Sequence, residues 1–171
     1  MPVLKIINAN EPGKYHDDKS YDDLARYIER TDKTLGKYIG GRAISPYQAA
    51  MEMRIVTESY GKSKGVHLRH MVLSFDHKCE PIAPEHAMAL AFEIAGFYCY
   101  RYQIIYGVHC DTEHLHIHFI MNQVSYLDGR KYPGTKKDFY DFQGYVSAIL
   151  DNLGMRLFVV SNQNERFNEK L

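Results

Sequence analysis

The residues best suited to chemistry lie in one short stretch, His109–His118, which holds four of the chain's nine histidines. Apolar runs typical of β-strands flank it, Tyr102–Val108 before it and Ile117–Val124 from its end onward. We predict that the two runs pair as an antiparallel hairpin with the histidines near its turn. Because side chains alternate between the two faces of a strand, the register of this hairpin decides which histidines meet.

With the turn at residues 112–113, His109 lies opposite His116, and His118 follows on the same face opposite Gly107, which leaves room beside it. Directly opposed Cβ atoms lie about 5 Å apart and diagonal ones about 7–8 Å apart, so three imidazoles can converge on one ion. Neutral imidazoles suit Zn, Mn, Ni or Co, which act as Lewis acids on a phosphoryl oxygen. The spacing therefore predicts a metal site on this face of the hairpin.

Two further residues of the stretch could support that site. Asp111 is the natural hydrogen-bond partner for an imidazole N–H, and such a bond fixes the tautomer of a ligating histidine. His114 could be a fourth ligand, a group that supports a ligand, or a substrate contact. The residues alone leave a hydrolase, a nuclease and a cupin-like oxygenase open.

The opposite face of the hairpin is apolar and is predicted to lie in the core. Its residues are Tyr102, Ile104, Tyr106, Val108, Cys110, Leu115, Ile117, Phe119 and Met121. On an earlier predicted strand, Val66–Phe75, the same alternation places His70 and Ser74 on one face.

The elements that must position these residues follow an α+β order with an antiparallel sheet. The other strands are predicted at Val3–Asn8, Tyr100–His109, His114–Val124 and Arg156–Ser161. A first helix is predicted from Ser20, with an apolar stripe of Leu24, Tyr27 and Ile28. A second helix is predicted from a capping box at Ser45–Gln48 to about Tyr60. Two later helices are predicted from Pro84 to about Phe97 and at Phe139–Leu153. The glycine-rich segment Thr31–Ala43 is predicted to be a mobile connection.

Composition indicates one globular domain, expected over residues 1–161, followed by a polar tail over residues 162–171. A chain of 171 residues that is 45% hydrophobic can bury a full core. Its zero net charge argues against general coating of a polyanion and favours local basic surface. Three cysteines without metal or redox spacing, no secretory signal and no apolar run of about 18 residues favour a cytoplasmic chain without a membrane segment.

A nucleophile has to come from outside the histidine stretch. A tyrosine hydroxyl, with an ordinary pKa of about 10, needs an activating cation or base before it attacks phosphorus. Tyr27 lies on the first predicted helix, just before the glycine-rich segment, and its pattern alone favours a packed helix tyrosine. Tyr15, Tyr21 and Tyr38 are nearby alternatives.

The histidine stretch also resembles a known family motif. The pattern His109-x-Asp111-x-x-His114-x-His116-x-His118-x-x-x-Asn122 is similar to the third motif of MobP/VirD2-type relaxases. These are the DNA-nicking enzymes of conjugative and mobilizable elements, in the HUH endonuclease superfamily. Further segments that resemble the family are Arg26–Thr34 around Tyr27, His70–Phe75, and Tyr126–Tyr132 after the histidines.

The resemblance implies a central five-stranded antiparallel sheet flanked by helices. It implies that His109, His116 and His118 bind one divalent ion (Mn, Mg, Zn, Ni or Co) and that Tyr27 is the nucleophile. The implied reaction is site- and strand-specific cleavage and rejoining of single-stranded DNA at an origin of transfer, through a 5′-phosphotyrosine. Accessory relaxosome proteins and a coupling protein are the implied partners of such an N-terminal catalytic domain.

The DNA is expected to lie across the histidine face. Side chains expected to support the ligands or to touch DNA are His114, Asn122, His70 and Ser74. Basic side chains expected to border the DNA are Lys33, Arg130, Lys131, Lys136 and Lys137. Asp111 is expected to act in catalysis through the histidine that it supports.

Two other readings remain open. A rolling-circle replication initiator of the same superfamily has its tyrosine after the histidines, and Tyr140 and Tyr145 on the last predicted helix would then be the candidates. A non-enzymatic DNA-binding module would hold a structural zinc, with four protein ligands and no open position.

Overall fold

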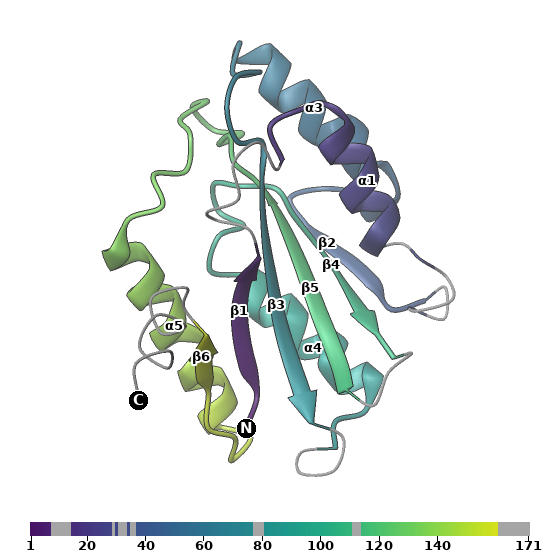
Figure 1. The fold of residues 1–171 in the computed structure, drawn as a ribbon, viewed down its shortest axis with the longest axis vertical. Helices are drawn as coiled ribbons and strands as arrows, with labels where there is room; N and C mark the ends of the chain where they lie inside the picture. The colour runs from purple at the N-terminus through teal and green to yellow at the C-terminus, as the bar shows by residue number, and fades with distance from the viewer. Residues whose placement is uncertain are drawn as a thin grey trace, which may run out of the picture.

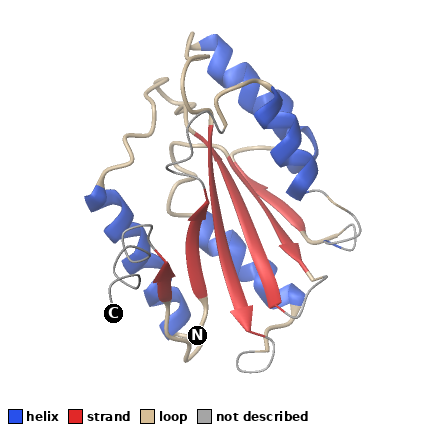
Figure 2. Ribbon diagram, in the orientation of Figure 1, coloured by secondary structure: helices blue, strands red, loops and turns tan. Residues whose placement is uncertain are grey.

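The computed structural model describes residues 1–7, 15–28, 30, 34, 37–76, 81–110 and 114–160. They form one sheet of strand order β2-β4-β5-β3-β1-β6 with helices on both faces (Figures 1 and 2). The strands are β1 Val3–Ile7, β2 Ile39–Arg42, β3 Leu68–Asp76, β4 Ile104–His109, β5 His114–Asn122 and β6 Phe158–Val160. The helices are α1 Lys19–Ile28, α3 Ala49–Ser59, α4 Pro84–Ala95 and α5 Lys136–Asp151, with a 3-10 turn, η1 Pro46–Gln48, before α3.

The pairing of the strands confirms the predicted α+β class. From β2 to β1 in the sheet order, five strands pair antiparallel, as the resemblance implied. A sixth strand, β6, pairs with β1 in parallel and makes the sheet mixed. The strand predicted from Tyr100 begins only at Ile104, because residues 96–101 form turns. Within the described residues, no helix is long and apolar enough to cross a membrane.

The prediction of a mobile connection at Thr31–Ala43 is wrong for residues Ile39–Arg42, which form the edge strand β2 paired with β4. The glycines there serve close packing. A Cβ at Gly40 would lie 2.4–2.5 Å from atoms of the Tyr106 ring, so only glycine lets that ring cover the strand. Tyr38, just before β2, is buried, and its hydroxyl donates to Oε1 of Glu85 on α4 at 2.5 Å.

Two helix starts differ from the prediction because of their caps. The Ser45 side chain makes no capping hydrogen bond, and the chain passes through η1 before α3 begins. The Ser45 backbone N–H instead donates to Oε1 of Glu52 at 3.3 Å. Helix α5 begins three residues before the predicted Phe139, because the Thr135 hydroxyl accepts a hydrogen bond from the Asp138 N–H.

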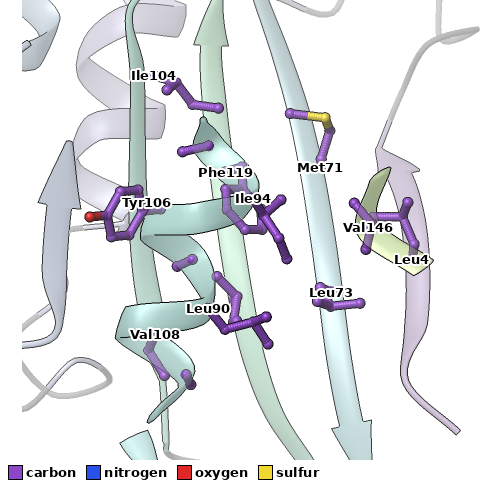
Figure 3. Close-up of a cluster of buried hydrophobic side chains, with 14 of the residues drawn as sticks. Leu4, Met71, Leu73, Leu90, Ile94, Ile104, Tyr106, Val108, Phe119 and Val146 are labelled. Atoms are coloured by element: carbon purple, nitrogen blue, oxygen red, sulfur yellow. The ribbon is translucent and has the colours of Figure 1, made fainter. Parts of the chain in front are cut away.

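The larger core lies between the sheet and helices α4 and α5. It contains the apolar hairpin face as predicted, with Cys110 partly buried at its margin. Leu90 and Ile94 of α4 lie over Tyr106 and Val108 of β4 and Phe119 of β5 (Figure 3). This side of the sheet therefore holds the strands in register from behind the histidines.

A second core lies on the histidine face of the sheet, under α1 and α3 (Figure 1). Its buried residues are Tyr21, Leu24, Ala25, Ile28, Ala49, Met53, Leu68, Ile105 and Ile120. These residues cover the part of the face away from the hairpin turn. The histidine face is thus divided between a core at one end and the histidines at the other. The sequence predicted a core on the opposite face only.

Candidate active site

The register of the hairpin confirms the predicted pairing. His109 of β4 lies opposite His116 of β5, and Gly107 lies opposite His118. Strand β3, on the other side of β5, pairs Ser74 with His116 and places His70 two residues beyond the partner of His118. Three adjacent strands therefore present one face that carries the candidate ligands together with His70 and Ser74.

The imidazoles of this face form one cluster around His118. The ring centroid of His118 lies 4.3 Å from that of His109, 5.3 Å from that of His70 and 6.1 Å from that of His116. His109, His118 and His70 are buried, whereas His116 is half-buried. His114 is exposed at the end of β5, with its ring 6.3 Å from that of His116.

The three imidazoles of His109, His116 and His118 have the donor chemistry that a divalent ion needs. Their ring separations match the geometry of a shared ion only in part. A metal–nitrogen distance of about 2.0–2.1 Å implies that two ligating imidazoles have centroids roughly 4.5–5 Å apart. The His109–His118 separation of 4.3 Å comes close to this value, while the His116–His118 separation of 6.1 Å is roughly 1 Å too long. Among the described residues, no three His, Cys, Asp or Glu side chains stand close enough to hold an ion. The shortfall lies at half-buried His116, the least enclosed of the three rings.

Tyr27 lies against the same cluster. Its ring stands edge-on to His118 and His109, with centroids 5.2 and 5.3 Å away, and its centroid lies 6.2 Å from that of His70. The ring is half-buried, so it is held by its neighbours without being enclosed by them. The structure thus brings the candidate nucleophile and the candidate ligands together from segments about 80–90 residues apart.

A glycine opposite His118 allows this approach. A Cβ at Gly107 would lie 2.9 Å from Cγ2 of Ile28 and 3.0 Å from its carbonyl oxygen. The space that Gly107 leaves is therefore filled by the last residue of α1, which follows Tyr27 directly. Leu24, Ala25 and Ile28 bury the apolar stripe of α1 in the second core, and this packing directs Tyr27 toward the histidines.

Other tyrosines hold different positions. Tyr21 is buried, its hydroxyl donates to Oγ1 of Thr57 at 2.9 Å, and burial raises its pKa. The Tyr38 hydroxyl is bonded to α4 on the far side of the sheet. Tyr140 and Tyr145 belong to α5, which packs on that far side too, and Tyr145 donates to the Glu93 carbonyl. Tyr15 is the alternative that does reach the site: its hydroxyl lies 3.2 Å from Nδ1 of His70.

Asn122 lies on the histidine face, but the structure does not bring it to the imidazoles. Its side chain is fully buried, and Nδ2 donates to the Met53 carbonyl and to Oε1 of Gln103, both at 3.1 Å. Its Oδ1 accepts from the Val124 N–H at 3.2 Å. Asn122 therefore ties β5 to α3 and to the segment before β4.

A buried polar group beside Asn122 carries no signal in the sequence. His67 is buried, and its Nδ1 lies 2.9 Å from the Tyr21 hydroxyl on α1. Burial lowers the pKa of the His67 imidazole. The two residues are far apart in sequence and have no local pattern, so only the fold reveals the pair.

The structure describes only some of the basic side chains that were expected to border the DNA across the histidine face. Arg130 is exposed and lies 3.7 Å from Asp128, and Lys137 is bonded to Asp141 on its own helix. Lys136 and Lys137 belong to α5, which packs behind the sheet, so the structure does not bring them to the histidines. The Lys131 ammonium donates to the carbonyls of residues 64 and 66, and burial lowers its pKa. Asp111 and Lys33 lie outside the described residues.

Comparison with known proteins places this geometry in a family. The family model for the MobA/VirD2-like relaxase nuclease domain matches residues 27–155. Protein rlx of Staphylococcus aureus is 28% identical over 95 residues, which are 56% of this chain and 28% of that protein. A second Staphylococcus aureus protein of that name is 32% identical over 78 residues, or 46% of this chain and 24% of that protein. The chain spans about a quarter of the length of these curated relatives.

Proposed function

Because this chain belongs to the family of MobA/VirD2-like relaxase nuclease domains, we propose that it cuts and rejoins single-stranded DNA at an origin of transfer through a 5′-phosphotyrosine. The observation that carries the proposal is the position of Tyr27, whose ring stands edge-on to two imidazoles at centroid distances of 5.2 and 5.3 Å. A tyrosine next to a cluster of imidazoles on a rigid sheet has the parts that a phosphoryl-transfer site needs.

In the proposed reaction, the Tyr27 hydroxyl attacks the scissile phosphorus, and a P–O bond to Tyr27 replaces the P–O3′ bond. The proton lost by Tyr27 is balanced by the proton that the leaving 3′-oxygen gains. The reverse attack by a 3′-hydroxyl restores the phosphodiester. The number of phosphate ester bonds stays constant in both directions, so no energy source or co-reactant is needed.

His109, His116 and His118 would hold one divalent ion, one of Mn, Mg, Zn, Ni and Co. When bound, such an ion withdraws charge from the non-bridging phosphate oxygens. The chain's own contribution is to fix the imidazoles on adjacent strands and to hold the Tyr27 ring beside them through α1. Attack requires the hydroxyl to come within about 3–3.5 Å of phosphorus, and the Tyr27 ring is only half-buried.

The alternatives fit the described residues less well. A rolling-circle initiator would use Tyr140 or Tyr145, but α5 lies on the opposite side of the sheet from the imidazoles. A structural zinc needs four protein ligands. The fourth imidazole here, that of His70, has its Nε2 3.0 Å from Nδ1 of His118, in a hydrogen bond between the rings.

The test is to map the covalent product. The protein is incubated with Mn²⁺ and single-stranded oligonucleotides that tile the origin of transfer of its mobile element, and any adduct is located by mass spectrometry. We expect the adduct on Tyr27, none with Tyr27→Phe, and an undiminished yield with the control Tyr140→Phe. An adduct on Tyr15, or one that persists in Tyr27→Phe, would overturn the assignment of the nucleophile.

A further inference from the structure

Three side chains from separate segments form a hydrogen-bonded chain that ends at a candidate ligand. The Tyr15 hydroxyl lies 3.2 Å from Nδ1 of His70, and Nε2 of His70 lies 3.0 Å from Nδ1 of His118. His70 and His118 are only 5% and 7% exposed, so the bond between them is shielded from water. Hydrogen bonds in such surroundings hold rings more firmly than they do in solvent.

The backbone of Tyr15 indicates that its position is imposed. Its φ is +60°, in the left-handed region that bulky residues rarely adopt. Such a conformation persists where the surrounding structure fixes it. Here the Tyr15 carbonyl accepts the His67 N–H at 2.7 Å, while the Tyr15 ring stands edge-on to the His70 ring at 6.4 Å. Tyr15 is therefore tied both to the start of β3 and to the first imidazole of the chain.

The bonds can have only two directions when both histidines are neutral, because a neutral imidazole has one N–H and one acceptor nitrogen. If Tyr15 donates to Nδ1 of His70, then His70 Nε2–H donates to His118, and Nε2 of His118 carries a hydrogen. If His118 Nδ1–H donates to His70, then His70 Nδ1–H donates to the Tyr15 oxygen, and Nε2 of His118 has a free lone pair. Only the second direction lets Nε2 of His118 act as a ligand.

We propose that His70 and Tyr15 are positioning residues that set the tautomer and ring orientation of His118. The proposal rests on the proposed metal-dependent function and goes beyond it by assigning the support of one ligand to a second histidine and a tyrosine. An ion bound by Nε2 of His118 would select one hydrogen-bond direction along the whole chain, as far as the Tyr15 hydroxyl.

Zinc titration by calorimetry, without DNA, tests whether His70 and Tyr15 strengthen zinc binding. Loss of the direct partner in His70→Leu is expected to weaken zinc binding by 10–100-fold, the usual effect of removing such a support. His70→Gln should recover part of this loss, because its amide oxygen can accept the His118 Nδ1–H. Tyr15→Phe, which removes a group one hydrogen bond further from the ligand, should weaken zinc binding by about 10-fold. Exposed His86→Gln and Tyr140→Phe are the matched controls and should bind as the wild type does.

Nitrogen NMR of the imidazole rings tests the direction of the bonds. In the zinc-loaded protein, both His70 and His118 should carry their hydrogen on Nδ1, and a scalar coupling should join Nε2 of His70 to Nδ1 of His118. A hydrogen on Nε2 of His70, or wild-type zinc affinity in His70→Leu, would overturn the proposal. A protein that shows the expected tautomers but forms no DNA adduct would overturn the nuclease proposal alone. A protein that forms the adduct with the opposite tautomer would overturn the positioning role alone.

Discussion

Replacing Gly107 with alanine tests whether the packing of α1 on β4 sets the position of Tyr27. The new Cβ would meet Cγ2 of Ile28 at 2.9 Å and its carbonyl oxygen at 3.0 Å. Carbon atoms in ordinary contact lie about 3.5–4.0 Å apart. The end of α1 must therefore retreat by roughly 0.5–1 Å, and Tyr27 precedes Ile28 directly on that end.

The retreat has a predicted effect on both rate and stability. A misplacement of about 1 Å can cost about 100-fold in rate, so the cleavage rate of Gly107→Ala should fall by roughly 10–100-fold. Overpacking of this kind costs about 1–3 kcal/mol. For a chain of this size, that loss corresponds to a Tm lower by about 2–12 °C. Zinc affinity should stay within about twofold, since the imidazoles belong to the strands and not to α1.

The assay is single-turnover cleavage well below the Tm, with zinc affinity measured on the same samples. Gly144→Ala is the control, because a Cβ at Gly144 would meet nothing within 4 Å. This variant adds the same methyl group in α5 and should cleave at the wild-type rate. A wild-type rate in Gly107→Ala would show that the α1 packing does not limit the position of Tyr27, and a loss of zinc binding would show that the substitution disturbs the ligands instead.

Further predictions concern single residues. His116→Ala should lower zinc affinity by more than about 100-fold, beyond the effect expected for a supporting residue, while circular dichroism stays native; full zinc stoichiometry at micromolar zinc would contradict this. Asn122→Ala should lower the free energy of unfolding in urea by about 2–4 kcal/mol, because it leaves buried partners unsatisfied, and should not change zinc affinity. The lowered pKa of buried His67 means that the unfolded chain binds more protons than the folded one below about pH 6.5, so stability should fall as the pH falls through that range; in His67→Gln this fall should be shallower. Arg26→Ala, on the turn of α1 next to Tyr27, should reduce the salt dependence of DNA binding by about 0.7 in log–log slope, whereas Lys136→Glu behind the sheet should leave the slope unchanged.

The register of the hairpin was predictable because a shift by one residue would exchange the histidine face for the apolar face. Period-two alternation on both strands, together with a two-residue turn at residues 112–113, predicts the pairing that buries Ile117 and Phe119 and groups His109 with His116 and His118. The sequence also placed Tyr27 on a helix and predicted the burial of Leu24 and Ile28, but Tyr27 itself lies beside the buried stripe and not within it. Its distance from the histidines depends on the packing of that helix against Gly107, which no local pattern records.

The structural features that the sequence did not predict have no periodic pattern of apolar and polar residues. Strand β2 is four residues long and includes two glycines, so composition alone favours a loop there. The pairing of Tyr15 with His70 joins residues 55 positions apart. Asn122 fits a motif position, yet its side chain bonds into a buried network, because spacing along a strand gives the face of a residue and not its neighbours.

The division of the histidine face between two uses has a consequence for how the molecule assembles. The β4–β5 hairpin, which carries His109, His116 and His118, forms from contacts that are local in sequence, whereas its pairing with β3 joins residues 38–54 positions apart, from Asp76 with His114 to Leu68 with Asn122. Helix α1, which belongs to the second core, lies earlier in the chain than these strands and docks on them, so its contacts are non-local as well. We therefore expect Tyr27 to reach the imidazoles after the β4–β5 hairpin has formed. On this order of events, a chain that is still folding would hold its proposed nucleophile away from the histidines, and the proposed cleavage of DNA would become possible only with the completed tertiary structure.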